Sequence, residues 1–214
     1  MNLWDKIVAE MIAAGKPDRP NFDTVRRSKL TALEGHTHRP VIVYASDFLN
    51  QAKVQMSGGD VSLDYSDKLG FMEVVREMEG TNLDLMVHSP GGIPEAVESV
   101  VAILRNRFDN IRVIVPDLAK SAATMLALSA DMVVLDEAGE LGPIDPQFNF
   151  RRQDGTVVTA PAQAIIDQFK YAAQQITENP KMLTPWLPIL QQYGPSLFVQ
   201  AQNAIEMSKL YVQD

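Results

Sequence analysis

The sequence predicts an α/β protein with a mostly parallel sheet covered by helices, and three observations support this class. Between residues 40 and 141, short apolar runs that suit buried strands alternate with segments in which apolar residues recur at helical spacing. The connections between these segments are short, as in repeated βαβ units. Two chemically unusual loops follow predicted strands, which is where open α/β sheets carry their functional groups.

The elements of this central part are expected in a regular order. Apolar runs predict buried strands, which lie at residues 41–44, 83–87, 111–115 and 132–135. Helical periodicity predicts helices, which lie at residues 66–78, 94–108 and 121–130. Each of these helices lies between two strands along the chain, as parallel pairing requires.

The two flanks of this central part are expected to be mainly helical. Before it, residues 2–14 and 23–33 show helical patterns, which predict an arm that packs on the main domain or on a neighbouring subunit. After it, a hairpin is predicted at residues 148–158, with its turn at Asp154-Gly155, and a helix at residues 160–176. Four prolines then restrict the chain to short helices until about residue 196.

We therefore expect a single structural domain with three parts. Residues 1–38 would form an N-terminal helical arm, residues 39–176 the catalytic core, and residues 177–214 a C-terminal helical segment. The last residues are still helical in pattern and uncapped, and the sequence does not decide whether the natural chain extends beyond Asp214.

Composition and charge restrict the class of protein further. The fractions of 46% hydrophobic and 21% charged residues are ordinary for a soluble globular protein, and the net charge of −8 argues against nucleic acid or an anionic membrane surface as the main partner. The chain has no cysteine, which excludes disulfides, a thiolate nucleophile and cysteine-bound zinc, and fits a cytoplasmic location. Asp5 and Lys6 interrupt the apolar N-terminal residues, so no secretory signal is predicted, and no apolar run is long enough for a membrane span.

The two unusual loops carry residue types that suit acyl transfer. The first contains Ser89-Pro90-Gly91-Gly92, and its glycines allow the backbone to approach a ligand closely. In the second, Ser121 precedes a helix of small residues, so the amide of Ala122 could join an oxyanion hole. Taken alone, the first loop could be a tight turn and Ser121 a helix N-cap. Together they predict a nucleophile opposite hydrogen-bond donors for a developing oxyanion.

The order of these motifs resembles the Clp-protease/crotonase superfamily. Within it, the similarity is greatest to the serine dehydrogenase proteinase family, relatives of signal peptide peptidase A and of NfeD-type peptidases. The matching residues fall between about 40 and 170, and include His88-Ser89-Pro90-Gly91-Gly92, Val115-Pro116, Ala119-Lys120-Ser121-Ala122-Ala123-Thr124, Ala127-Leu128-Ser129-Ala130-Asp131 and Leu141-Gly142-Pro143-Ile144-Asp145-Pro146-Gln147. The family typically has Ser-Gly-Gly-Thr where this chain has Ser121-Ala122-Ala123-Thr124.

The resemblance implies a fold, an activity and a mode of assembly. The fold would be a Clp protease/crotonase-like spiral of ββα units, and the protein a homo-oligomer. As a serine endopeptidase it would need no cofactor, and Ser121 would attack a carbonyl of an extended peptide. The backbone amides of Gly91, Gly92 and Ala122 would hold the oxyanion, and the peptide would lie between the two loops.

The base that must activate a serine hydroxyl is not assigned by the sequence. Clp proteolytic subunits use a histidine that follows the serine, and Asp145 stands near that place in this chain. Asp145 could accept a proton only if burial raised its pKa, and a role in a turn or cap fits equally well. NfeD-type relatives use a lysine in an Ala-Pro-Pro-Lys segment, where this chain has Gln163.

Other titratable side chains are weaker candidates for a supporting role. Lys120 adjoins the nucleophile, and His88 ends the strand before the glycine loop. His36 and His38 lie in the front arm and could reach the site only from a neighbouring subunit, whereas Lys170 and Lys181 carry no motif, so the base stays open.

Three functions therefore stay open, with a serine peptidase favoured. A non-catalytic peptide-binding or scaffold protein is favoured by the missing histidine and by Gln163. A crotonase-like enzyme acting on acyl thioesters is disfavoured, because no basic cluster is present for the coenzyme phosphates. No metal site is expected, since the pair His36 and His38 lacks a third ligand, and no phosphate-binding loop is present.

Overall fold

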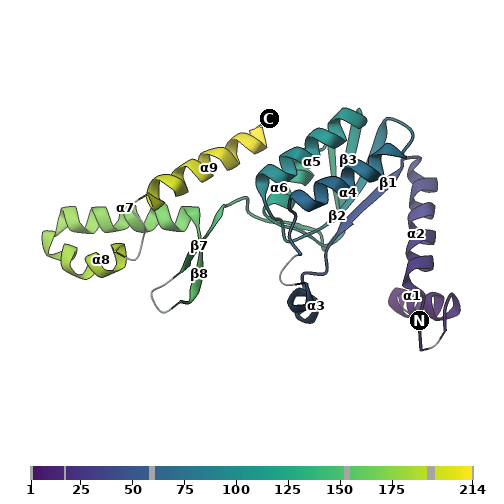
Figure 1. Cartoon of the computed structure of the whole chain (residues 1–214), viewed down its shortest axis with the longest axis horizontal. Coiled ribbons are helices and arrows are strands. Elements are labelled where there is room, and N and C mark those ends of the chain that lie inside the picture. Colours follow the sequence, from purple (N-terminus) through teal and green to yellow (C-terminus); the bar gives the residue numbers. More distant parts are fainter. Residues whose placement is uncertain (1, 17, 58–60, 152–154, 192–195, 214) are drawn as a thin grey trace.

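A four-stranded parallel sheet forms the centre of the computed structural model, which describes residues 2–16, 18–57, 61–151, 155–191 and 196–213. The strand order is β1–β2–β3–β5, and the first three of these strands are labelled in Figure 1. These strands are β1 (Val41–Ala45), β2 (Asn82–His88), β3 (Asn110–Val115) and β5 (Met132–Leu135). The expected parallel sheet is confirmed, and each strand begins and ends within one residue of its predicted bounds.

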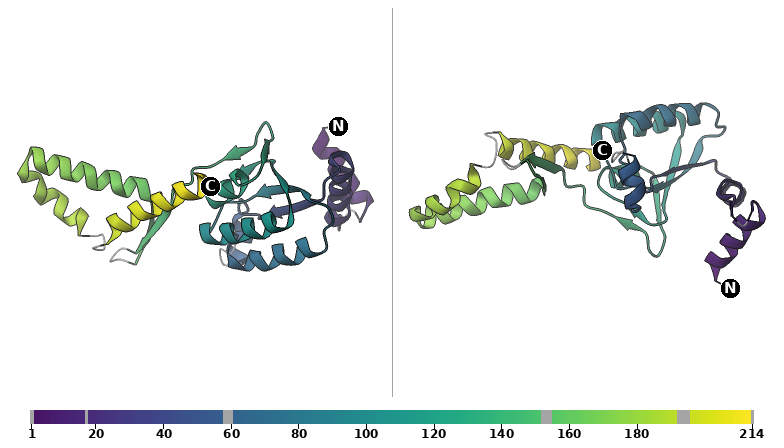
Figure 2. Two further views of the ribbon diagram at one scale, coloured as in Figure 1. Left: turned by 90° about the horizontal axis from the view of Figure 1, so that it is seen from above. Right: turned by 60° about the horizontal axis from the view of Figure 1, so that its bottom comes forward.

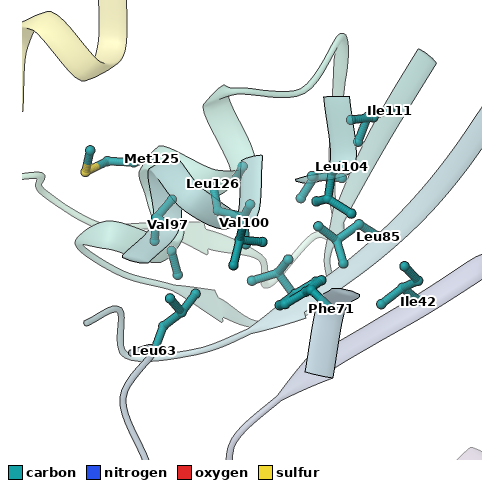
Figure 3. Close-up of a cluster of buried hydrophobic side chains, with 14 of the residues drawn as sticks. Ile42, Leu63, Phe71, Leu85, Val97, Val100, Leu104, Ile111, Met125 and Leu126 are labelled. Atoms are coloured by element: carbon teal, nitrogen blue, oxygen red, sulfur yellow. The ribbon is translucent and has the colours of Figure 1, made fainter. Parts of the chain in front are cut away.

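Three helices pack on one face of the sheet and enclose the main core. They are α4 (Tyr65–Arg76), α5 (Pro94–Arg107) and α6 (Ala122–Leu128). Figure 3 shows their side chains meeting those of the strands, with Phe71 of α4 near Ile42 and with Val100 and Leu104 of α5 in the same cluster. The helix starts follow local rules, because Asp64 caps α4 in a capping box and Pro94 opens α5.

A second, smaller layer consists of short backbone pairings beyond the carboxyl ends of the main strands. Leu63 pairs with Gly92, Ser89 pairs with Ala119, and β4 (Leu118–Ala119) pairs with β6 (Glu140–Leu141), all in parallel. Each main strand thus passes into a short second stretch before its helix or next strand. This arrangement confirms the spiral of ββα units that the resemblance implied.

The N-terminal arm is made of α1 (Leu3–Ala13) and α2 (Phe22–Thr37), followed by His38 in a left-handed conformation. Both helices were predicted, although α2 is longer than expected. The two helices pack on each other, and the arm extends from one end of the sheet (Figure 2). Leu3 and Trp4 remain 73% and 66% exposed, so the outer face of α1 is apolar and uncovered.

A buried charge cluster joins this arm to the amino end of the sheet. Asp84 in β2 is fully buried, and its carboxylate lies 2.7 Å from Nε of Arg39 and 2.6 Å from a terminal nitrogen of Arg112. Arg39 also donates hydrogen bonds of 2.8 Å to the carbonyl oxygens of Leu83 and Asn110. The residue that links α2 to β1 is therefore fixed to two neighbouring strands.

The C-terminal part begins with an antiparallel hairpin, β7 (Gln147–Arg151) and β8 (Val157–Pro161), as predicted. Asp154, in its predicted turn, lies outside the described residues. Four helices follow: α7 (Ala162–Glu178), the 3₁₀ turn η1 (Pro180–Met182), α8 (Leu183–Leu190) and α9 (Leu197–Gln213). One further helix, α3 (Gln51–Met56), was not anticipated.

The helices α7 and α9 form a second apolar cluster, separate from the main core. It contains Ala162, Ile165 and Ile166 of α7 and Leu197 and Ala201 of α9. α7 and α8 project from the sheet, whereas α9 runs back and contacts α6 (Figure 1). Within the described ranges, no helix is long and apolar enough to cross a membrane.

Candidate active site

Ser121 occupies a strained turn between β4 and α6. Its backbone has φ 50° and ψ −123°, a conformation that residues with a side chain rarely adopt. The sequence also allowed Ser121 to cap the helix, but its side chain makes no capping hydrogen bond. Non-glycine residues in such conformations cluster at functional sites, and nucleophilic serines at strand-to-helix turns are one example.

The glycine loop lies directly against this turn. Gly91 has φ 97°, and a Cβ atom on it would lie 2.4 Å from the carbonyl oxygen of Lys120 and 2.8 Å from Cβ of Ser121. The two loops are joined by backbone hydrogen bonds, from Ser89 N–H to the Leu118 carbonyl at 2.9 Å and from Lys120 N–H to the Ser89 carbonyl at 3.0 Å. The predicted proximity of Gly91 and Ser121 is therefore present.

The amides of the two loops differ in whether they already have a partner. The Gly91 amide donates to the buried Oγ of Ser89 at 3.1 Å. Within the described part of the chain, no group accepts a hydrogen bond from the amides of Gly92 or Ala122, and the Ser121 hydroxyl makes no capping hydrogen bond. Two backbone donors and the candidate nucleophile thus have no hydrogen-bond partner there.

Two residues that the sequence reasoning did not assign hold this geometry. The buried hydroxyl of Thr124 donates to the Ala119 carbonyl at 2.7 Å and accepts from the Gly142 amide at 3.0 Å, which ties α6 to the segment after β6. Leu63 donates to the Gly91 carbonyl at 2.8 Å and accepts from the Ile93 amide at 2.8 Å, which supports the outer side of the glycine loop. The threonine in the Ser-x-x-Thr motif was the available signal for the first contact.

The two supporting candidates, Lys120 and His88, are engaged with other groups. The Lys120 ammonium lies 2.6 Å from the Glu140 carboxylate, and this hydrogen bond and charge hold the pKa of Glu140 below its usual value. Nδ1 of His88 accepts from the Leu118 amide at 3.4 Å, with the Asp117 carboxylate 3.6 Å away.

The remaining base candidates are Asp145, His36 and His38. The Asp145 carboxylate accepts a hydrogen bond of 3.3 Å from the backbone N–H of Gln163. This bond caps the start of α7. Among the described residues, no hydrogen bond or ion pair joins Asp145 to Ser121. His36 and His38 lie in the N-terminal arm.

In the described ranges, no group of three His, Asp or Glu side chains could hold a metal ion.

A strained serine at the start of a helix, with unpartnered amides and a glycine loop beside it, is an arrangement that suits acyl transfer. The family model described as ClpP-like SDH-type serine proteinase matches residues 61–180. The chain belongs to this family.

Curated relatives and solved structures are similar over part of the chain. Two uncharacterized proteins of Methanocaldococcus jannaschii are 43% identical over 66 residues, 31% of this chain, and 28% identical over 105 residues, 49% of it. The chain spans only 23% and 33% of the lengths of these relatives.

Among solved structures, a mutant of a membrane-bound stomatin-specific protease aligns with 55% of this chain and 59% of its own, at 18% identity and a TM-score of 0.40. A second mutant of that protease, in complex with a substrate peptide, covers 49% and 48%, at 21% identity and a TM-score of 0.37. The ClpP protease catalytic domain from Plasmodium falciparum covers 50% and 58%, at 12% identity and a TM-score of 0.34.

Proposed function

We propose that the protein is a serine endopeptidase in which Ser121 is the nucleophile. The observation that carries this proposal is the contact between Gly91 and the strained Ser121 turn, with two unpartnered amides beside it. Membership of a serine proteinase family supports the same chemistry.

In the proposed reaction, Ser121 Oγ forms a bond to the carbonyl carbon of an extended peptide. The carbonyl oxygen becomes an oxyanion and accepts hydrogen bonds from the amides of Ala122 and Gly92. The Gly91 amide joins them only after it leaves Ser89 Oγ, so Gly92 is the principal donor from the glycine loop. The hydroxyl proton passes to a base, for which Asp145 is the candidate from the sequence.

Assembly into a homo-oligomer is part of the proposal. The outer face of α1 exposes Leu3 and Trp4, and α8 exposes Leu183, Leu187 and Ile189 at the far end of the molecule (Figure 1). Apolar helix faces of this kind are commonly covered by a partner. A neighbouring subunit could also bring a basic group to Ser121.

A second candidate function is peptide binding without catalysis. It is favoured by the ion pair between Lys120 and Glu140 and by the absence, among the described residues, of a base in contact with the Ser121 hydroxyl. In this case the amides would hold a peptide carbonyl without an attack.

Labelling with a serine-reactive fluorophosphonate, followed by intact mass, distinguishes the two functions. We expect one adduct on the wild type, none on Ser121→Ala, and an unchanged adduct on the matched control Ser129→Ala, whose hydroxyl donates to the Leu126 carbonyl at the other end of α6. Slower labelling of Asp145→Asn would identify the base. A folded wild type that takes no adduct would contradict the peptidase and leave peptide binding.

A further inference from the structure

A pocket of about 510 Å³ lies where α9 covers the segment that follows β6. Its apolar walls are Pro143, Ile144, Pro146 and Ile205, and Ile144 also packs against the main core. α9 lies outside residues 61–180, which match the family model. The size and apolar lining are typical of a site for a small ligand.

Two residues of opposite charge, Asp145 and Lys209, are among those that line this pocket. Asp145 accepts one hydrogen bond, from the Gln163 amide, and no ion pair links Asp145 or Lys209 to any residue in the described part of the chain. A carboxylate and an ammonium attract each other. A ligand that carries both charges can form one ion pair with Asp145 and another with Lys209.

The other polar groups of the pocket are already used as donors. The Ser208 hydroxyl donates to the Ala204 carbonyl at 3.0 Å, and the Gln163 side-chain nitrogen donates to Asp167 at 2.7 Å. Lys209 is therefore the group best placed to hold an anion, and Asp145 the group best placed to hold a cation.

We propose that this pocket binds a short zwitterionic peptide. Asp145 holds its terminal ammonium, Lys209 holds its terminal carboxylate, and Pro143, Pro146 and Ile205 contact its apolar side chains. The termini of an extended dipeptide are about 7 Å apart, a span that suits two charges too distant to form an ion pair. Asp145 is also the candidate base for Ser121, so the binding site is tested in the Ser121→Ala protein, where no catalysis by Ser121 is possible.

Calorimetric titration of the dipeptide Leu-Leu into the Ser121→Ala protein tests this site. The matched probes are N-acetyl-Leu-Leu, which lacks the ammonium, and Leu-leucinamide, which lacks the carboxylate. We expect each blocked end to weaken binding about tenfold, the size of one charge-assisted hydrogen bond.

Variants assign each end of the peptide to its residue. Lys209→Met should weaken Leu-Leu about tenfold and leave Leu-leucinamide unchanged, whereas Asp145→Asn should weaken Leu-Leu and leave N-acetyl-Leu-Leu unchanged. Lys170→Met, an exposed lysine of α7, is the control and should bind like the parent. Circular dichroism and melting temperature confirm that each variant is folded.

Three outcomes would overturn the proposal. Leu-Leu could fail to bind at millimolar concentration, or all three probes could bind equally to all variants. A double-mutant cycle of Asp145→Asn and Lys209→Met in thermal unfolding could also show strong coupling without ligand. That coupling would mean that the two side chains pair with each other in solution.

Discussion

The polar groups at the two ends of the central sheet differ in whether they have interaction partners. At the amino end, Asp84 is fully buried between Arg39 and Arg112, and Arg39 is also bonded to backbone carbonyls. At the carboxyl end, the Ser121 hydroxyl and the Gly92 and Ala122 amides have no partner among the described residues. The charged groups at the amino end are therefore paired, whereas donors at the carboxyl end are not.

The amino end is therefore expected to contribute to stability, and the carboxyl end to the proposed function. A buried carboxylate with two cationic partners is costly to disturb, because removal of one partner leaves uncompensated charge. A serine held at φ 50° costs stability in the free protein, and its strain is retained where it serves a site. We therefore expect mutations at the two ends to change stability with opposite signs.

The largest expected effect is at the amino end. Asp84→Ala leaves two buried or half-buried guanidinium groups without their carboxylate, and should lower the free energy of unfolding by about 3–5 kcal/mol. Urea unfolding at neutral pH measures this change. Asp109→Ala, at an exposed position, is the control and should stay within about 0.5 kcal/mol of the wild type. If Asp84→Ala lowered the free energy of unfolding as little as the control does, the expected difference between the two ends would be wrong.

A smaller effect of opposite sign is expected at the carboxyl end. Ser121→Gly relieves the positive φ and should raise the free energy of unfolding by about 0.5–1 kcal/mol, after the greater chain entropy of glycine is subtracted. Ser121→Ala keeps the strain and should not gain this stability. Calorimetric melting of the three proteins makes the test, and a glycine variant no more stable than the alanine variant would show that the turn is unstrained.

The smallest expected effect is at Asp131, which also lies at the amino end of the sheet. Asp131 accepts from Arg105 and from the Ile111 amide at 2.7 Å each, and these contacts hold its pKa below the usual value. Its charged form therefore stabilises the fold above about pH 4, and this contribution is lost as the pH falls through the lowered pKa.

Asp131→Asn should flatten the dependence of stability on pH below about pH 4, by less than about 1 kcal/mol because the side chain is partly exposed. Urea unfolding from neutral to acidic pH measures this slope. Asp109→Asn is the control and should keep the wild-type dependence of unfolding free energy on pH. If Asp131→Asn also kept it, the charge of Asp131 would not contribute to stability.

Most of the sheet and its helices could be predicted from the sequence, because long apolar runs such as 111–115 and periodic segments such as 94–108 are strong signals. The second layer of short backbone pairings could not be predicted. Its pairings involve one or two residues, such as Leu63 with Gly92, and so short a contact has no periodicity to detect.

The candidate site divides in the same way. The meeting of Gly91 and Ser121 followed from the resemblance, whereas the strained φ of Ser121 and the bond from Gly91 to Ser89 depend on the folded backbone. The pocket was not foreseen, because α9 reaches residues 143–146 only through tertiary packing. The base is unassigned both in the sequence and among the described contacts.

The second layer also affects how this chain can change its length. Surface loops usually accept inserted residues, since each adds little closure entropy. Here the stretch between β3 and Ser121 is itself paired on both sides, to Ser89 and to β6, by backbone atoms alone. Many side chains could be exchanged along it without loss of those pairings, but one extra residue would shift Ser121 past Gly91. Length, more than composition, is therefore the constrained property of this connection.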